Sequence, residues 1–326
     1  MTTRSTSVRG LTEGAILAAL VALLAVAVRY VPLLGTAAGF VCPLPLAALV
    51  IRRGLRIGIL ATAVAAAIGG IIAGPLVSAA IVLAFGPLGI TLGVGVARGW
   101  SAGRIVLAGS IVGTAGILAS LGITLVLGGV NPYVVMIESM RQSQQVTAQF
   151  YQGLGVPQEQ INRVSGQMRQ AIDLMPRLIP LLVVIGGVAT AYLNVVVGRA
   201  VLGRFGYRLP HLPPMREWSI PAPLMWVFVL GFVFTAWGGA VSPALQSAGL
   251  NLTVLMQMAY AVQGLIVGWV LMERYRVAGW LRWIPIFLAL SNPLFGMAAF
   301  FLGLADSAFY LRERWRTSTS GASEGL

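Results

Sequence analysis

The chain has 326 residues, of which 58% are hydrophobic and 10% are charged, and its formal net charge is +13 at pH 7. This composition excludes an ordinary soluble domain, in which about 25% of residues are charged. All basic side chains but one histidine are arginines, in short clusters between apolar runs. The positive charge therefore indicates orientation in a membrane, with the lipid bilayer and no nucleic acid as partner.

Apolar runs long enough to cross a bilayer, for which a helix needs about 20 residues, recur along the chain. Eight of them are expected to be full spans: 13–34, 35–51, 55–73, 75–97, 104–128, 178–200, 220–241 and 252–273. The sequence thus predicts an all-α fold, a polytopic transmembrane helix bundle. Its expected parts are a Gly/Ala-rich five-helix membrane module (1–128), an extracytoplasmic amphipathic helical insert (129–177), C-terminal membrane helices (178–311) and a disordered polar tail (312–326).

The insert is rich in glutamine and carries charges of both signs. Apolar residues at helical spacing, a break from Gly153 to Pro157 and a proline at 176 predict two amphipathic helices, the second ending before Pro176. A surface hairpin on the outer membrane face is favoured over a lid that gates a ligand site.

The last apolar stretch, 281–311, is too long for one comfortable span and is interrupted at Asn292-Pro293. It predicts a broken helical hairpin, with a kinked ninth span as the alternative. Arginines cluster in alternate connections between spans, so the positive-inside rule places the N-terminus in the cytoplasm. The hairpin would also keep Arg312, Arg314 and Arg316 on that side.

Few polar groups lie at membrane depth, where burial is costly unless they are paired. The candidates for ligand binding are Arg29, Tyr30, Asn194, Asn292 and Asp306. Asn194, like Gln257 and Gln263, could equally hydrogen-bond between helices. Asp306 could form an ion pair with Arg282 or Arg312, or it could be a carboxylate that couples transport to protons or cations. Glu13 is expected at the membrane interface, near the start of the first span.

This inventory predicts no enzyme. The spans offer no histidine, lysine or second aspartate to complete a catalytic pair, and their serines have no obvious base. Without a phosphate-binding loop the chain would need separate ATPases to energise transport. One cysteine, Cys42, and one histidine, His211, provide neither a disulfide nor a metal site, and no cofactor is expected.

Two resemblances are carried by short motifs. Ala-xxx-Ala spacings in the first helix, Arg29-Tyr30-Val31-Pro32 and a proline-broken second helix ending in Arg52-Arg53-Gly54 resemble the start of substrate-binding components of energy-coupling factor transporters. That resemblance implies a solute site and a docking face for a coupling protein, for which the candidates are Ala15, Ala18, Ala19 and Ala22.

Most of the chain resembles the uncharacterised YybS-like family of bacterial multi-pass membrane proteins, which implies the bacterial cell membrane. The residues that carry this second resemblance are Pro180 to Asn194 with Arg199, Arg216 to Pro221, Asn292-Pro293, Gly303 to Asp306 and Arg312.

Three functions remain open. The first is a solute-binding subunit or small-molecule permease that works with a separate coupling protein and ATPases, its ligand unknown. The second is a membrane scaffold or regulator that binds a partner through small-residue helix faces. The third is a channel or secondary transporter that uses the broken 281–311 stretch, because discontinuous helices commonly form membrane sites. A closed outward cavity near Arg29 would favour the first.

Overall fold

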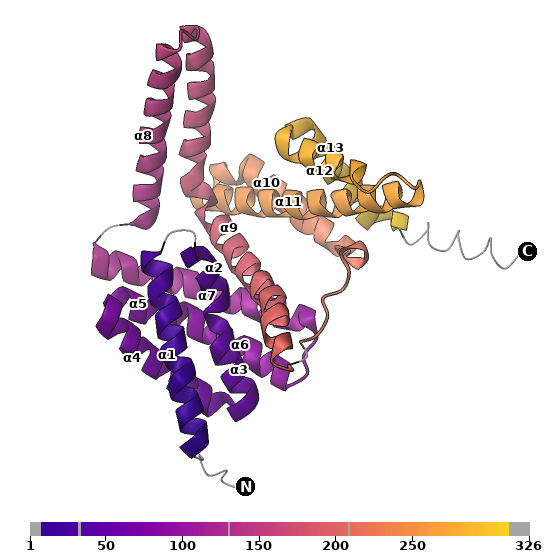
Figure 1. Cartoon of the computed structure of the whole chain (residues 1–326). Helices are drawn as coiled ribbons and strands as arrows, with labels where there is room; N and C mark the ends of the chain where they lie inside the picture. The colour runs from indigo at the N-terminus through magenta and orange to yellow at the C-terminus, as the bar shows by residue number, and fades with distance from the viewer. Residues whose placement is uncertain (1–7, 32–33, 130, 208, 313–326) are drawn as a thin grey trace, which may run out of the picture. The chain divides into compact units, whose positions relative to one another are not determined.

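The computed structural model describes residues 8–31, 34–129, 131–207 and 209–312. Within these ranges the chain is helical and contains no strand, which confirms the all-α fold class. Its contacts divide it into two compact units, 1–212 and 213–326 (Figure 1). The residues of the expected tail beyond 312, with Arg314 and Arg316, lie outside the described residues.

Unit 1 is a bundle of helices that continues into a helical hairpin. Its elements are α1 (Val8–Tyr30), α2 (Leu34–Val41), α3 (Pro43–Arg53), α4 (Leu55–Ala73), α5 (Pro75–Ala80), the π-helical η1 (Ile81–Phe85), α6 (Gly86–Ala97), α7 (Ala102–Gly128), α8 (Pro132–Gly153) and α9 (Gln158–Arg204).

Small side chains let the helices of unit 1 approach closely. α1 packs on α3 and α4, and α7 packs on α9. Fully buried alanines at this core include Ala18 and Ala65, together with Val21, Leu46 and Leu49. In a bilayer, where apolar burial gives no driving force between helices, such close packing supplies much of the stability.

The second expected span takes another form. Residues 35–51 fall in two short helices, α2 and α3, which are separated at Cys42. Pro43 and Pro45 open α3, and because proline lacks a backbone N–H it begins a helix more readily than it continues one. Neither helix alone is long enough to cross a bilayer.

The insert also differs from the expectation. α8 begins after Asn131, whose side chain accepts a hydrogen bond from the Tyr133 N–H at 3.0 Å, and it packs on the first part of α9. The second helix does not end before Pro176, because α9 continues through Pro176 and Pro180 to Arg204. Prolines are tolerated within membrane helices when neighbouring groups compensate for the lost hydrogen bond. In Figure 1, α9 leaves the hairpin and changes direction as it enters the bundle.

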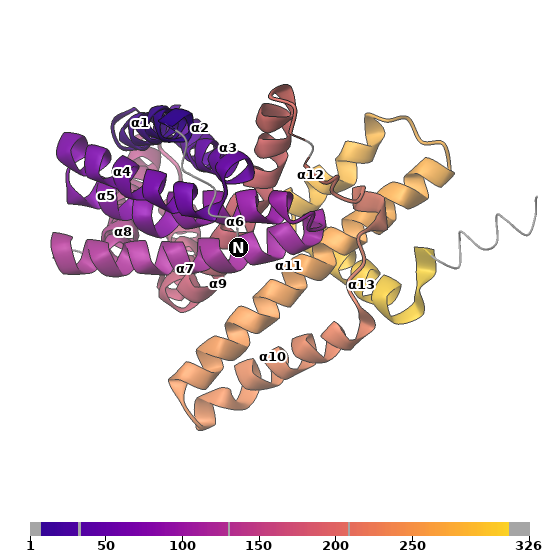
Figure 2. The ribbon, with the colours of Figure 1, turned by 90° about the horizontal axis from the view of Figure 1, so that it is seen from below.

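Unit 2 contains two long helices and a broken pair. Its elements are the short 3₁₀ turns η2 (Met215–Glu217), η3 (Ala222–Leu224), η4 (Gly238–Ala240) and η5 (Leu281–Trp283), with α10 (Met225–Trp237), α11 (Pro243–Arg274), α12 (Ile284–Ser291) and α13 (Pro293–Phe309). Figure 2 shows α10 lying along α11, which also packs on α13.

The break at Asn292-Pro293 is present. Residues 281–291 and α13 meet at a bend of 111°. The Asn292 side chain accepts a hydrogen bond from the Leu294 N–H at 2.9 Å, so it caps α13. Further along, Gly303 and Gly264 allow α13 and α11 to meet backbone to backbone, since a Cβ at either glycine would collide with a carbonyl oxygen of the other helix.

Seven helices of the described chain are long and apolar enough to cross a membrane, or eight if the bent pair counts as one span. Five of them lie in unit 1: Thr12–Tyr30, Leu55–Ala73, Pro75–Ala97, Ala102–Leu127 and Gln158–Arg204. The other two are Ala222–Ala240 and Pro243–Arg274. The chain is therefore an integral, multi-pass membrane protein.

Candidate functional site

A groove in unit 1 lies between α1, α3 and the end of α9. Its volume is about 720 Å³, which lies within the range of small-molecule sites. Its apolar walls are formed by Ile16, Leu17, Leu20, Val41, Leu44, Pro45, Ala48, Val201, Leu202 and Phe205. One end of the groove is polar, and there it is lined by Thr12, Glu13, Arg52, Arg53 and Tyr207.

Helical spacing places the groove-lining side chains of each helix on the same wall of the groove. Ile16 and Leu20 are four residues apart on α1, as are Leu44 and Ala48 on α3, so each pair lies on one face of its helix. Ile16 and Phe205 are each 65% exposed, which leaves the groove open along its side.

An ion-pair cluster closes the polar end. The Glu13 carboxylate accepts from Arg52 Nη1 at 2.6 Å and from Arg53 Nη2 at 2.8 Å and Nε at 3.1 Å. Arg52 Nε donates to the Tyr207 hydroxyl, and the Arg52 guanidinium lies 5.3 Å from the Tyr207 ring centroid. Two guanidinium groups thus face one carboxylate, which leaves one surplus positive charge. We did not predict this cluster as a site, although Glu13 and the Arg52-Arg53 pair were both visible in the sequence.

The candidates at the end of α1 and in α9 do not line this groove. Arg29 and Tyr30 are exposed, and the Arg29 guanidinium lies 5.8 Å from the Tyr30 ring centroid. Asn194 is buried, but its Nδ2 donates to the Thr190 carbonyl of the same helix at 2.9 Å. Its Oδ1 has no hydrogen-bond partner among the described residues. The structure therefore does not join these residues into one ligand site.

The alanines proposed for partner docking are divided between two environments. Ala18 and Ala22 are fully buried inside unit 1, whereas Ala15 and Ala19 are exposed. The stripe formed by the four alanines follows the border between the buried and the exposed face of α1. Ala18 and Ala22 lie on the buried side, so they cannot contact a partner at the surface of the bundle. This corrects the four-residue docking face, of which only Ala15 and Ala19 remain.

The two C-terminal candidates both have structural contacts in unit 2. Asn292 is exposed and caps α13. Asp306 accepts from Arg312 Nη2 at 2.7 Å, from Arg312 Nε at 2.9 Å and from Gln263 Nε2 at 2.8 Å. Arg282, the other partner considered for Asp306, pairs instead with Glu273 at 3.1 Å.

Backbone groups complete the network around Asp306. Gln263 Oε1 accepts from the Ile220 N–H at 2.8 Å, and the Ser307 hydroxyl donates to the Ile220 carbonyl at 3.0 Å. Arg312 Nη1 reaches the Arg216 carbonyl at 3.1 Å. A cavity of about 360 Å³ borders this network. Because the carboxylate is paired and hydrogen-bonded on both oxygens, the geometry favours a structural role.

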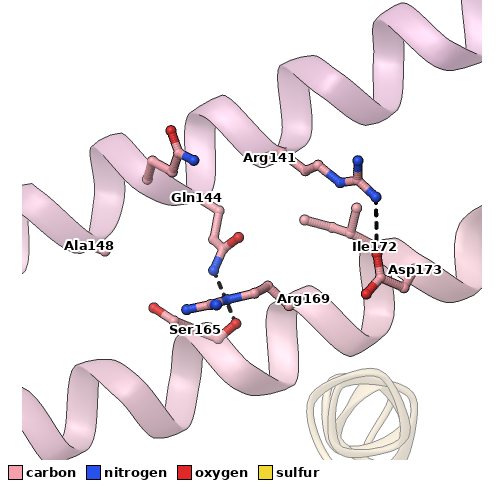
Figure 3. A pocket seen from close by; sticks show the side chains of 8 residues that line it. Arg141, Gln144, Ala148, Ser165, Arg169, Ile172 and Asp173 are labelled. Carbon is pink, nitrogen blue, oxygen red and sulfur yellow. Dashed lines mark hydrogen bonds and ion pairs between the residues drawn. The ribbon is translucent and has the colours of Figure 1, made fainter.

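A smaller cavity of about 330 Å³ lies between α8 and α9 of the hairpin (Figure 3). Arg141 pairs with Asp173 at 3.1 Å, and Gln144 Nε2 donates to the Ser165 carbonyl at 3.0 Å. Near the start of α8, partial burial raises the pKa of the Tyr133 phenol above its usual value. The ion pair and the hydrogen bond join α8 to α9, as polar contacts between packed helices commonly do.

The family of the chain follows from comparison with known proteins. The family model described as "Predicted membrane protein (DUF2232)" matches residues 19–307. The chain belongs to this family. It is also 25% identical over 306 residues to "Uncharacterized protein YybS" of Bacillus subtilis (strain 168), a similarity that covers 94% of this chain and 98% of that protein. No solved structure matches the chain significantly.

Proposed function

We propose that this chain is a solute-binding membrane subunit or permease that takes an amphipathic small molecule into the groove of unit 1. The groove itself carries the proposal, because it is apolar along its walls, open along its side and charged at one end. Such a cavity complements a molecule with an apolar body and one polar group. A molecule of this kind dissolves in the bilayer and can enter between helices from the lipid.

The positive-inside rule supports a position for the groove in the membrane. Arg52 and Arg53 end α3 at the polar end, which we place at the cytoplasmic interface together with the N-terminus. The walls then extend into the hydrocarbon layer of a bacterial cell membrane. This arrangement replaces the outward-facing site near Arg29 with a lateral one near the opposite surface.

Energy for transport would come from other proteins. We propose that the chain is not an enzyme and that it works with a separate coupling protein and ATPases. Ala15 and Ala19 are exposed and lie outside the groove, so they could contact such a protein while a solute is bound.

A scaffold or regulator is the second candidate. The same open groove favours it, because an apolar helix of a partner could fill the space between α1 and α9. A channel or secondary transporter based on 281–311 has less support, since the Asp306 carboxylate is already paired with Arg312.

Photolabelling tests the proposal directly. The purified protein in phosphatidylcholine nanodiscs is irradiated with a long-chain alcohol that carries a diazirine, and the labelled peptides are mapped by mass spectrometry. We expect label in 12–20, 41–53 and 201–207 above the level on the lipid-exposed residues Ile71 of α4 and Val126 of α7. Equal labelling of the groove and of all other exposed helices would contradict the proposal.

A matched pair of variants sharpens the test. Ala48→Trp places a large side chain in the groove, whereas Ala19→Trp adds the same bulk on the exposed face of α1 outside it. Ala48→Trp should remove the groove label and Ala19→Trp should keep it, with circular dichroism and gel filtration to show that both variants are folded. If partner recovery from membranes, and not labelling, responds to Ala48→Trp, the scaffold is the better answer.

A further inference from the structure

We infer that the ligand of this groove is anionic: a single-chain amphiphile whose carboxylate or phosphate head binds Arg52 and Arg53 in competition with Glu13. The inference rests on the proposed function, since it names the chemical class of the solute. It predicts that Glu13 acts as an internal substitute for the head group and occupies the arginines when no ligand is bound.

Charge is the first support. Glu13 carries one negative charge and faces two guanidinium groups, so the polar end keeps one uncompensated positive charge. Among the residues that the structure describes, no other carboxylate lines the groove. An anionic head would neutralise the surplus, whereas a cationic head would add to it and leave only Glu13 as its partner. Charge complementarity therefore selects an anion.

Free donor capacity is the second support. A guanidinium group has five N–H donors, and its planar fork suits the oxygens of carboxylates and phosphates. Towards Glu13 and Tyr207, Arg52 uses Nη1 and Nε, and Arg53 uses Nη2 and Nε. The remaining N–H groups offer a first contact to the oxygens of a head group, which then competes with Glu13 for the donors that Glu13 holds.

Access is the third support. The Arg52 side chain is 47% exposed and the Arg53 side chain 31% exposed, so a head group can reach both from the interface. The apolar wall of α1 begins at Ile16 and reaches Leu20, roughly 10 Å from Glu13 at 1.5 Å per residue. A chain bound by its head would thus lie along Ile16 and Leu20 with its far end in the bilayer.

Competition measures the head-group preference. In zwitterionic phosphatidylcholine nanodiscs, competitors that share one alkyl chain are compared for their ability to displace the groove label of the diazirine alcohol. Their head groups are a hydroxyl, a carboxylate, a phosphate and a trimethylammonium group. The carboxylate and the phosphate should compete about tenfold better than the hydroxyl, the gain expected from one charge-assisted hydrogen bond at a partly exposed site. The carboxylate and phosphate arms distinguish a fatty acid from a phospholipid-like ligand.

Substitutions in the Glu13 cluster should change the binding of anionic heads in opposite directions. Arg52→Gln should reduce the preference for anionic heads, and Arg52→Gln combined with Arg53→Gln should abolish it while the neutral alcohol still binds. Glu13→Gln removes the competing anion and should strengthen anionic binding severalfold. Arg56→Gln is the matched control, because it removes the same charge from an exposed residue near the end of α3 that does not line the groove.

The outcomes separate this inference from the proposed function. If no amphiphile labels the groove, the proposed function fails. If the groove is labelled but all heads compete equally, the function stands and the anionic class is wrong. Better competition by trimethylammonium would also overturn the inference, because it would make Glu13 the recognition group. If Glu13→Gln weakens anionic binding, the carboxylate is no competitor of the ligand.

Discussion

The Glu13 cluster of unit 1 and the Asp306 cluster of unit 2 both pair a carboxylate with arginine, and they differ in burial. In unit 1, Glu13, Arg52 and Arg53 have side chains that are 21%, 47% and 31% exposed. In unit 2, the Asp306 and Arg312 side chains are only 4% and 10% exposed. The same chemical groups can therefore serve different purposes, because burial decides whether a charge can exchange its partner.

The buried cluster is fixed from several sides. Gln263 and Arg312 both donate to Asp306, and Ser307 bonds to the segment that precedes η3. Nearby, Gly264 and Gly303 bring α11 and α13 into backbone contact, so the helices that carry these groups cannot easily separate. Exchange of the Asp306 partner would break the hydrogen bonds that Arg312 makes to Asp306 and to the Arg216 carbonyl.

Removal of the buried charge should give the largest effect. We expect Asp306→Asn to lower the free energy of unfolding by about 3–5 kcal/mol, because Arg312 would remain buried without its counter-charge. The measurement is unfolding of the detergent-solubilised protein by titration with sodium dodecyl sulfate.

A double-mutant cycle checks the cause. Asp306→Asn combined with Arg312→Gln should recover part of the loss, since no unpaired charge is then left. Glu273→Gln, which removes the partner of the more exposed Arg282, should cost clearly less. If Asp306→Asn kept full stability and abolished pH-dependent ion or solute flux in vesicles, Asp306 would be a coupling carboxylate and the structural interpretation would be wrong.

Tight packing beside the buried cluster should give the next effect. Gly264→Ala would bring a Cβ against the Ala299 carbonyl, so we expect a loss of about 1–3 kcal/mol as α11 and α13 are forced apart. Gly268→Ala is the control, because a Cβ there meets open space on the same helix. The same titration should find Gly268→Ala within about 1 kcal/mol of the parent protein, on the stabilising side. Equal effects of the two substitutions would show that the glycine contact does not fix the pair.

Sequence patterns predicted the parts of the fold that depend on local chemistry. Long apolar runs predicted spans where the structure has α4, α7 and α11, and Asn292-Pro293 predicted the break before α13. The hypothesis that Asp306 pairs with Arg312 was within reach because the two residues are six positions apart. Local patterns failed where the environment decides. Pro176 predicted a helix end, yet α9 continues through it into the bundle.

The groove could not be predicted because its parts are distant in sequence. Arg52 and Arg53 lie about forty residues from Glu13, and as a pair they are equally typical of a cytoplasmic loop. The alanine stripe of α1 posed a similar problem. Its spacing marks one strip of the helix, but only the packing of α1 on α3 and α4 shows that Ala18 is inside and Ala19 outside.

The exposed cluster should give the smallest loss of stability. Glu13→Gln removes the carboxylate that joins α1 to α3, but ion pairs with exposed partners contribute about 1 kcal/mol or less, and salt screens them. We therefore expect the free energy of unfolding to fall by no more than about 1 kcal/mol, with a difference that shrinks at high salt. Asp173→Asn in the hairpin, where both partners are at least half exposed, provides the reference for a surface pair. A loss as large as that of Asp306→Asn would mean that Glu13 is held as firmly as the buried carboxylate. A ligand could not then displace Glu13 from Arg52 and Arg53, and the competition that we infer at the groove would be untenable.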